Sequence, residues 1–387
     1  MKPRRYQLRK EAVGAALHHP WIFRGHLSSA AAVLRDGELL RLVDGANRIV
    51  GYGLYQATGA IAIRMLRRGP APPDAAWLRD RIAAAVLRRA ELATRTDGIR
   101  LVNGESDSLP GVVIDRFGDT LVVTSYATGA DVLARYAARV LALGPKSPIV
   151  GPARHVLLRP ARLRHTPAGP AQVLRGAPPE IATITEDGMT FAIDLAAGQK
   201  TGAYLDLRGL RREVAAAPLA GARVLNLFAY SGMLGRAAER AGAAAIVQVD
   251  ASEHALAFAA AHHVADPARH TFLTADVFAH LPAYAGEPFD LVIIDPPSMT
   301  SKAAQVPSAL AAYRKLYGAA ARLVRPGGVL VAACCTSRIE RAVFHRTVGD
   351  ALGPGFTMDH EIPPEPDHPV GFPQADYLKI GWWKLAA

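Results

Sequence analysis

The segment that decides the fold is VLNLFAYSGMLGRAAERAG, residues 224–242. An apolar, strand-like run enters a turn of small residues and continues into a stretch with helical periodicity. Four more apolar runs alternate with helical, often Ala-rich stretches: AIVQVDA (245–251), RHTFLTAD (269–276), FDLVIIDPP (289–297) and GGVLVAACC (327–335). This alternation, which begins near residue 214, predicts an α/β fold with a mostly parallel sheet and helices on both of its faces.

The residues that follow each run are candidate ligand contacts, because ligands of doubly wound sheets bind beyond the carboxyl ends of the strands. Gly232 is expected to let the backbone approach a nucleotide-like ligand closely. Asp250 ends the second run about 20 residues after the glycine turn and is the candidate acceptor for ribose hydroxyls. The alternative for Asp250 is a helix cap, a role that Ser252 could also fill. The pattern GxGxxG is absent, which disfavours a NAD- or FAD-dependent dehydrogenase.

Two further junctions carry polar side chains. Asp276 follows the third run and could accept a hydrogen bond from an adenine amino group, with Val277 and Phe278 packing against the ring. The fourth run ends in Asp295-Pro296-Pro297. Two prolines remove two backbone donors and force a rigid, extended exit, which fixes the Asp295 carboxylate at the mouth of the sheet.

Cys334 and Cys335 end the fifth run and are the only cysteines of the 387 residues. Two cysteines exclude a disulfide framework and are too few for a cysteine-based zinc site, so no metal is expected. Neighbouring residues of a strand point to opposite faces, so one thiol should face the DPP corner and the other should pack. A cysteine on a buried strand is usually a small apolar residue, but beside DPP a nucleophile is the better interpretation.

The amino-terminal quarter carries most of the charge. The chain has a net charge of +11, and residues 1–100 hold 18 Lys and Arg against 8 Asp and Glu, so 18 − 8 = +10. A basic surface of this kind suits a polyanion, although an Arg-rich composition that only aids solubility explains the charge equally well. Residues 1–68 have the pattern of short strands and turns, and residues 182–195 have that of a hairpin. No apolar run approaches the roughly 20 residues that cross a bilayer, and no signal peptide is recognisable, so a soluble cytoplasmic protein is expected.

The motifs VLNLFAYSG, VQVDAS, FDLVIIDPPS and RPGGVLVAACCTSRI resemble the ordered motifs of class I S-adenosylmethionine-dependent methyltransferases. Over nearly the whole length, the chain resembles the RlmI-like bacterial large-subunit ribosomal RNA 5-methylcytosine methyltransferases. HHPWIFRGHL resembles that family's PUA domain, a small RNA-binding β-barrel, ESDSLPGVVIDRFGD its central domain and GQKTGAYLDLR its signature hairpin. The resemblance implies a PUA-like domain over residues 1–70, a central α+β domain over 71–185 and a Rossmann-like methyltransferase domain over 186–387.

The resemblance also implies the chemistry and its residues. S-adenosylmethionine is the expected cofactor, and RNA, most simply large-subunit ribosomal RNA, is the expected partner; a homodimer is compatible with what is known of relatives. Cys335 matches the family's nucleophile, Asp295 is expected to bond the base near nitrogen 3, and Lys200 either lowers a thiol pKa, holds a phosphate or is simply a solvated surface lysine. The residues expected to bind the cofactor are Phe228, Ser231, Gly232, Asp250, Ala251, Ser252, Asp276, Val277, Asp295 and Pro296.

Two departures from the family pattern lie near the expected pocket and bear on the target base. Leu207 stands where relatives usually carry Gln, and Met299 stands where they often carry an aromatic residue. One alternative is therefore an exocyclic-amine methyltransferase, although such enzymes place an aromatic residue after the prolines, where this chain has Ser298. Another is a non-catalytic RNA-binding or ribosome-assembly factor that retains a cofactor pocket.

Overall fold

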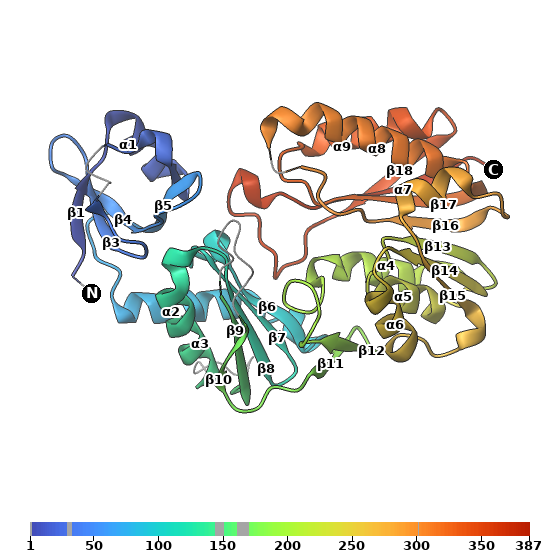
Figure 1. Cartoon of the computed structure of the whole chain (residues 1–387), viewed down its shortest axis with the longest axis horizontal. Coiled ribbons are helices and arrows are strands. Elements are labelled where there is room, and N and C mark those ends of the chain that lie inside the picture. Colours follow the sequence, from blue (N-terminus) through green and yellow to red (C-terminus); the bar gives the residue numbers. More distant parts are fainter. Residues whose placement is uncertain (1, 29–32, 144–150, 161–169, 301) are drawn as a thin grey trace. The chain divides into compact units, whose positions relative to one another are not determined.

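The computed structural model describes residues 2–28, 33–143, 151–160, 170–300 and 302–387 (Figure 1). The chain divides into two compact units. The first unit contains Met1–Leu205 and Pro366–Phe372, and the second contains Asp206–Glu365 and Pro373–Ala387. The chain therefore passes from one unit to the other three times, and the first unit receives seven residues from near the carboxyl end.

A seven-stranded sheet forms the centre of the second unit, with the strand order β15-β14-β13-β16-β17-β19-β18. The five strands expected from the sequence are all present and pair in parallel. β19 runs antiparallel to both β17 and β18. The bounds are β13 (Arg223–Leu227), β14 (Ala245–Asp250), β15 (His270–Thr274), β16 (Phe289–Ile294), β17 (Val324–Cys334), β18 (Phe356–Ile362) and β19 (Lys379–Leu385).

Helices cover both faces of this sheet, which confirms the α/β fold (Figure 1). α8 (Val306–Ala321) and α9 (Arg341–Leu352) lie on one face, and α4 (Arg208–Ala216), α5 (Met233–Arg240) and α6 (Glu253–His262) lie on the other. The short α7 (Val277–Ala283) follows β15. Beneath α8 and α9, the rings of Tyr313, Tyr317 and Phe344 are fully buried and pack against one another and the sheet. This core holds the carboxyl ends of β16 and β17 in place.

The first unit contains two five-stranded sheets and a hairpin. The amino-terminal sheet has the order β1-β3-β4-β5-β2, and the second has the order β10-β9-β8-β7-β6. The hairpin expected over residues 182–195 is confirmed as β11 and β12. The strand bounds are β1 (Arg4–Gln7), β2 (Trp21–Phe23), β3 (Leu39–Val43), β4 (Ile49–Tyr55), β5 (Ile61–Arg68), β6 (Gly98–Asn103), β7 (Val112–Phe117), β8 (Thr120–Ser125), β9 (His155–Arg159), β10 (Gln172–Arg175), β11 (Ile181–Glu186) and β12 (Met189–Asp194).

In the described part of the first unit, the helices α1 (Lys10–His18), α2 (Ala75–Leu87) and α3 (Asp131–Ala142) accompany these sheets. Reading residues 1–68 as strands and turns alone was incomplete, because α1 lies among them. The nine residues of α1 include Gly14, and no side chain caps its amino end, so its sequence signal is weak. Among the described residues, no helix is both long and apolar enough to cross a membrane.

The seven-residue segment from the carboxyl end contributes a buried polar network to the first unit. The Arg89 side chain is fully buried and donates two hydrogen bonds to the Asp107 carboxylate, at 2.9 and 2.6 Å. It also donates to the backbone carbonyl of Asp367 at 3.1 Å. The Asp367 carboxylate in turn accepts from the backbone amide of Arg100 at 3.0 Å. A buried guanidinium needs partners for its donors, and this segment supplies one of them.

Candidate active site

The loop after β13 has an unusual backbone. Phe228 and Tyr230 have φ values of 59° and 47°, and Gly232 has a φ of 73°. Left-handed geometry costs a non-glycine residue about 1–2 kcal/mol, so two such residues in one loop must be held by their surroundings. Strained backbone of this kind is common at ligand sites, and this loop lies where the strand order reverses between β14 and β16.

Asp250 holds this loop. Its Oδ2 accepts a hydrogen bond from the backbone amide of Tyr230 at 2.8 Å, and its Oδ1 accepts from the amide of Ser252, also at 2.8 Å. Asp250 does not cap the following helix, because Ser252 does so by accepting from the amide of Ala255 at 3.2 Å. The carboxylate is half-buried at the end of β14, with further lone pairs beyond those two bonds. It is therefore oriented by the backbone and retains the capacity to accept from a ribose.

Gly232 is required here by local packing. Its φ is left-handed, and an added Cβ would lie 2.7 Å from the Cβ of Ala259 and 3.0 Å from Oε1 of Gln248. The missing Cβ thus makes room for α6 and for a buried glutamine that accepts from Asn226 at 3.3 Å. The expectation that Gly232 also brings the backbone close to a ligand stays a prediction. Its neighbour Ser231 is buried in the same turn.

The third strand end adds a carboxylate and an aromatic ring. Asp276 is exposed and caps α7, with its Oδ1 accepting from the amide of Phe278 at 2.9 Å. Val277 is buried, whereas Phe278 is exposed and meets the ring of Phe228 edge to face at 5.7 Å. The loops after β13 and β15, where the cofactor is expected, are thus in contact through two aromatic rings. Ala251, which follows Asp250, is exposed.

The two thiols differ in their surroundings. The Cys334 side chain is fully buried in the core beneath α8 and α9, and its Sγ accepts from the amide of Thr336 at 3.4 Å. Cys335 is half-buried, and its thiol donates to the carbonyl oxygen of Pro296 at 3.6 Å. β16 and β17 are parallel neighbours, so the DPP corner and the cysteine pair leave the sheet at the same edge. The structure therefore brings Cys335, Asp295 and Pro296 together.

Thr336 joins the segment after Cys335 to three elements. Its Oγ1 lies 3.0 Å from the hydroxyl of Tyr313 on α8 and accepts from the amide of Met299, in the loop after DPP, at 3.2 Å. Burial, reinforced by the neighbouring Cys334, raises the pKa of Tyr313, so this hydroxyl stays protonated. The carbonyl of Thr336 accepts from Nζ of Lys379 on β19 at 3.0 Å. Sequence patterns did not identify Thr336, Tyr313 or Lys379; a lysine inside the apolar run YLKIGWW was the signal that could have found the last.

Lys200 belongs to the first unit, whereas Cys335 and Asp295 belong to the second, so its role beside them stays a prediction. It is exposed, has a left-handed φ of 52°, and its Nζ lies 4.0 Å from the ring centre of Tyr204. Of the two departures from the family pattern, Leu207 is buried, and Met299 is half-buried against the core of the second unit.

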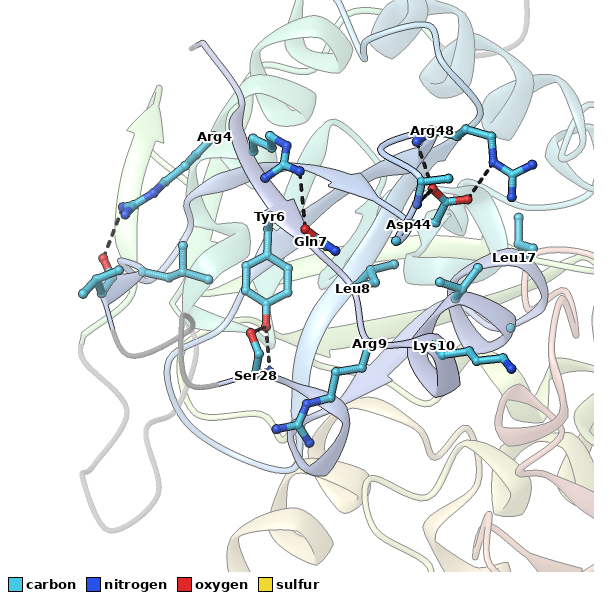
Figure 2. A pocket seen from close by; sticks show the side chains of 17 residues that line it. Arg4, Tyr6, Gln7, Leu8, Arg9, Lys10, Leu17, Ser28, Asp44 and Arg48 are labelled. Atoms are coloured by element: carbon cyan, nitrogen blue, oxygen red, sulfur yellow. Dashed lines mark hydrogen bonds and ion pairs between the residues drawn. The ribbon is translucent and has the colours of Figure 1, made fainter.

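A basic cavity of about 1080 Å³ lies in the amino-terminal part of the first unit (Figure 2). Among the described residues that line it, Asp44 is the one acidic residue, and it pairs with Arg48 at 2.8 Å. Hydrogen bonds from the backbone and side chain of Arg48 hold the pKa of Asp44 below its usual value. The cations that line the cavity exceed this single carboxylate and are Arg4, Arg5, Arg9, Lys10 and Arg48.

The strand ends of the second unit fit an adenosine-containing cofactor. An oriented carboxylate at Asp250 suits ribose hydroxyls, and the half-buried ring of Phe228 and the exposed ring of Phe278 suit a purine. These groups lie at the carboxyl edge of a parallel sheet, at the point where its strand order reverses. Such an arrangement is that of a nucleotide-type ligand site.

Comparison with known proteins identifies the class. The family model of S-adenosylmethionine-dependent methyltransferases matches residues 120–377, and that of PUA-like domains matches residues 8–68. A ribosomal RNA large subunit methyltransferase of Deinococcus radiodurans is 35% identical, over 93% of this chain and 92% of that protein. A ribosomal RNA large subunit methyltransferase I of Klebsiella pneumoniae is 33% identical, over 93% of each. The chain belongs to this family of S-adenosylmethionine-dependent methyltransferases with an amino-terminal PUA-like domain, and S-adenosylmethionine is its cofactor.

Solved structures agree on the fold. A methyltransferase from Streptococcus mutans matches with a TM-score of 0.83 at 20% identity, covering 99% of this chain and 100% of that one. A second structure, the methyltransferase SMU.776 complexed with SAH, matches with a TM-score of 0.84 at 21% identity and the same coverage. The expected combination of a PUA-like domain and a Rossmann-like methyltransferase domain is thus confirmed, whereas the predicted boundaries at residues 70 and 185 stay predictions.

Proposed function

We propose that this protein methylates carbon 5 of a cytosine in large-subunit ribosomal RNA through a covalent bond to Cys335. One observation carries the proposal: the half-buried Cys335 thiol lies against the DPP corner, with Sγ 3.6 Å from the Pro296 carbonyl, while Cys334 is sealed in the core. A reactive thiol at the strand edge that also bears the cofactor residues is what cytosine-5 transfer requires, because carbon 5 is a poor nucleophile until carbon 6 is attacked.

In this mechanism the Cys335 thiolate forms a bond to carbon 6, and the ring electrons move to carbon 5. When bound, S-adenosylmethionine would supply an electrophilic methyl group to carbon 5 and would leave as S-adenosylhomocysteine. A base then removes the carbon 5 proton, the ring electrons return, and the bond between Sγ and carbon 6 breaks to release the thiolate. Asp295 would bond the ring near nitrogen 3, and it must carry a proton to do so, because nitrogen 3 accepts and gathers negative charge during the attack. Pro296 and Pro297 keep Asp295 in place, because a proline ring fixes its own φ and disfavours helical geometry in the residue before it.

The substrate assignment rests on three observations. The relatives that match over 93% of the chain are named as ribosomal RNA large subunit methyltransferases. The first 100 residues hold 18 Lys and Arg against 8 Asp and Glu, a net charge of +10. The cavity in the PUA-like domain is lined by five cations against one carboxylate. A basic cavity on a PUA-like domain suits the phosphates of RNA, and the target base must be unpaired or flipped to reach a thiol at the sheet edge.

The exocyclic-amine alternative has weaker support. The residue after the two prolines is Ser298, whose hydroxyl lies 3.3 Å from Oγ1 of Thr336, so no aromatic ring is available there to stack on the base. A purely RNA-binding role leaves unexplained why a half-buried thiol and the oriented Asp250 are both present at the sheet edge.

Mass spectrometry of nucleosides decides among these functions. Large-subunit ribosomal RNA made without modifications is incubated with the protein and isotopically labelled S-adenosylmethionine, then digested. Labelled 5-methylcytidine is the expected product. Label on an exocyclic amine would replace the proposal with the first alternative, and the absence of any label in RNA that the protein binds would favour the non-catalytic role.

A further inference from the structure

A buried lysine lies on β19, the strand that pairs with the end of β17 at the cysteine pair. Lys379 begins β19, and its Cα pairs with that of Cys334, the last residue of β17. Its side chain is 1% exposed. Nζ donates to the carbonyl of Thr336 at 3.0 Å and to that of Tyr377 at 3.1 Å. The ammonium therefore holds the backbone one residue beyond Cys335.

Among the residues that the structure describes, Lys379 forms no ion pair with a carboxylate. Asp376, which interacts electrostatically with Lys379, pairs with Arg341 instead. Burying an ammonium without a carboxylate partner is unfavourable, so a lysine here is not explained by stability alone. Positive charge beside a thiol favours the thiolate, which is the nucleophilic form.

We propose that Lys379 is a positioning residue for Cys335: its ammonium holds the segment after β17 through the Thr336 carbonyl and favours the thiolate form of Cys335. This inference rests on the proposed function, in which Cys335 is the nucleophile. Thr336 transmits the constraint, because its hydroxyl binds the loop after DPP while its carbonyl binds the ammonium. The loop and the thiol are thus fixed against each other.

The charges around Lys379 are consistent with this role. Burial, together with the charge of Arg341, lowers the pKa of Lys379 below its usual value, although Cys334, Asp376 and Cys335 act to raise it. Burial, together with the charges of Arg341 and Lys379, lowers the pKa of His345 to about 4, so this imidazole is neutral at physiological pH. The ionisable groups that interact electrostatically with Lys379 are Cys334, Cys335, Arg341, Asp376 and His345.

The test measures Cys335 as the only thiol, in a Cys334→Ala background. The rate of alkylation by iodoacetamide is followed as a function of pH, together with S-adenosylmethionine binding as a check of the fold. With Lys379 intact, the midpoint of the rate should lie below the ordinary cysteine value of about 8.5. Lys379→Met should raise the midpoint by about one pH unit, which slows alkylation roughly tenfold near pH 7. Lys379→Arg should restore most of the wild-type behaviour.

The control is Lys384→Met, on the same strand, because Lys384 is an exposed lysine that pairs with Asp359 at 2.9 Å. This substitution should leave the midpoint unchanged. A Lys379→Met protein that binds cofactor but keeps the wild-type midpoint would overturn the proposal. If Lys379→Met does not fold, a midpoint at or above about 8.5 with Lys379 intact overturns it equally.

The alkylation assay uses no RNA, so a failure of the proposed role of Lys379 can be distinguished from a failure of the proposed methylation function. A midpoint that depends on Lys379, combined with labelled product other than 5-methylcytidine, would reject the proposed function and keep the electrostatic role of Lys379. An unchanged midpoint in a protein that makes 5-methylcytidine would reject only the role of Lys379.

Discussion

Cys334 and Cys335 are adjacent in sequence, and their different burial predicts different responses to substitution. Cys335→Ala should abolish methylation and leave S-adenosylmethionine affinity intact, because it removes a covalent step rather than a binding contact. Cys334→Ala should retain activity and lower the free energy of unfolding by about 0.5–3 kcal/mol, as for other core substitutions. Methyl transfer, calorimetric cofactor binding and denaturant unfolding measure these three quantities.

A trapped adduct identifies the reacting thiol directly. RNA that contains 5-fluorocytosine should form a denaturant-resistant complex with the wild-type protein, because fluorine at carbon 5 blocks the final loss of a proton. Peptide mapping should place the link at Cys335. A link at Cys334, or full activity of Cys335→Ala, would reject the assignment.

Asp250 should govern cofactor affinity. Asp250→Ala removes the carboxylate that orients the Tyr230 and Ser252 amides and that is expected to accept from the ribose. We expect S-adenosylmethionine binding to weaken by about 1–3 kcal/mol, as for removal of a charged hydrogen bond. Asp266→Ala is the control, because it removes a carboxylate that caps the turn Pro267–Arg269 and is not among the residues expected to bind the cofactor. Equal calorimetric affinities for Asp250→Ala and wild type would exclude Asp250 as a ligand.

At the scale of the elements, the close packing of the turn that leads into α5 can be tested by comparing Gly232, which lies in that turn, with Gly221, which precedes β13. Gly232 and Gly221 have φ values of 73° and 74°, but an added Cβ overlaps neighbours only at Gly232. Gly221→Ala should cost about 1–2 kcal/mol from left-handed geometry alone. Gly232→Ala should cost a further 1–3 kcal/mol or so, because Ala259 and Gln248 must move. Urea unfolding of both variants measures the difference, and equal costs would show that α6 adapts freely.

The sequence predicted those elements whose pattern is local. The strands of the methyltransferase sheet have runs of apolar residues, and β11 and β12 alternate around a Gly-containing turn, so both were expected. The residues at the ends of β13, β14 and β16 followed from the general position of ligands in such sheets. α1 lacks a cap and contains Gly14, which left it without a clear signal.

The contacts of Thr336 and Lys379 could not be derived from the sequence in the same way. They depend on the pairing of β17 with β19, two strands 45 residues apart at the Cys334 and Lys379 positions, and on the antiparallel direction of β19. An apolar pattern does not encode strand direction or register between distant strands. Position in the sheet, rather than residue type, therefore makes Lys379 a neighbour of the thiols.

For the molecule as a whole, the basic cavity should set the salt dependence of RNA binding. Arg9→Gln combined with Lys10→Gln removes two exposed cations that line it. The slope of log affinity against log salt should become shallower by about 0.7–0.9 for each phosphate that the variant no longer neutralises. Arg314→Gln combined with Lys315→Gln, two exposed cations on α8, is the matched control. Equal slopes for the two double variants would show that the cavity does not hold RNA phosphates.

The network that joins Arg89 to Asp367 spans 278 residues of sequence. During synthesis at about 5–20 residues per second, the carbonyl of Asp367 is made tens of seconds after Arg89. Until then, the growing chain has its Arg89–Asp107 pair but not the segment that completes their surroundings. The amino-terminal unit, although made first, therefore reaches its final form only when the carboxyl end leaves the ribosome, and a nascent chain arrested before residue 366 should hold an unfinished copy of it.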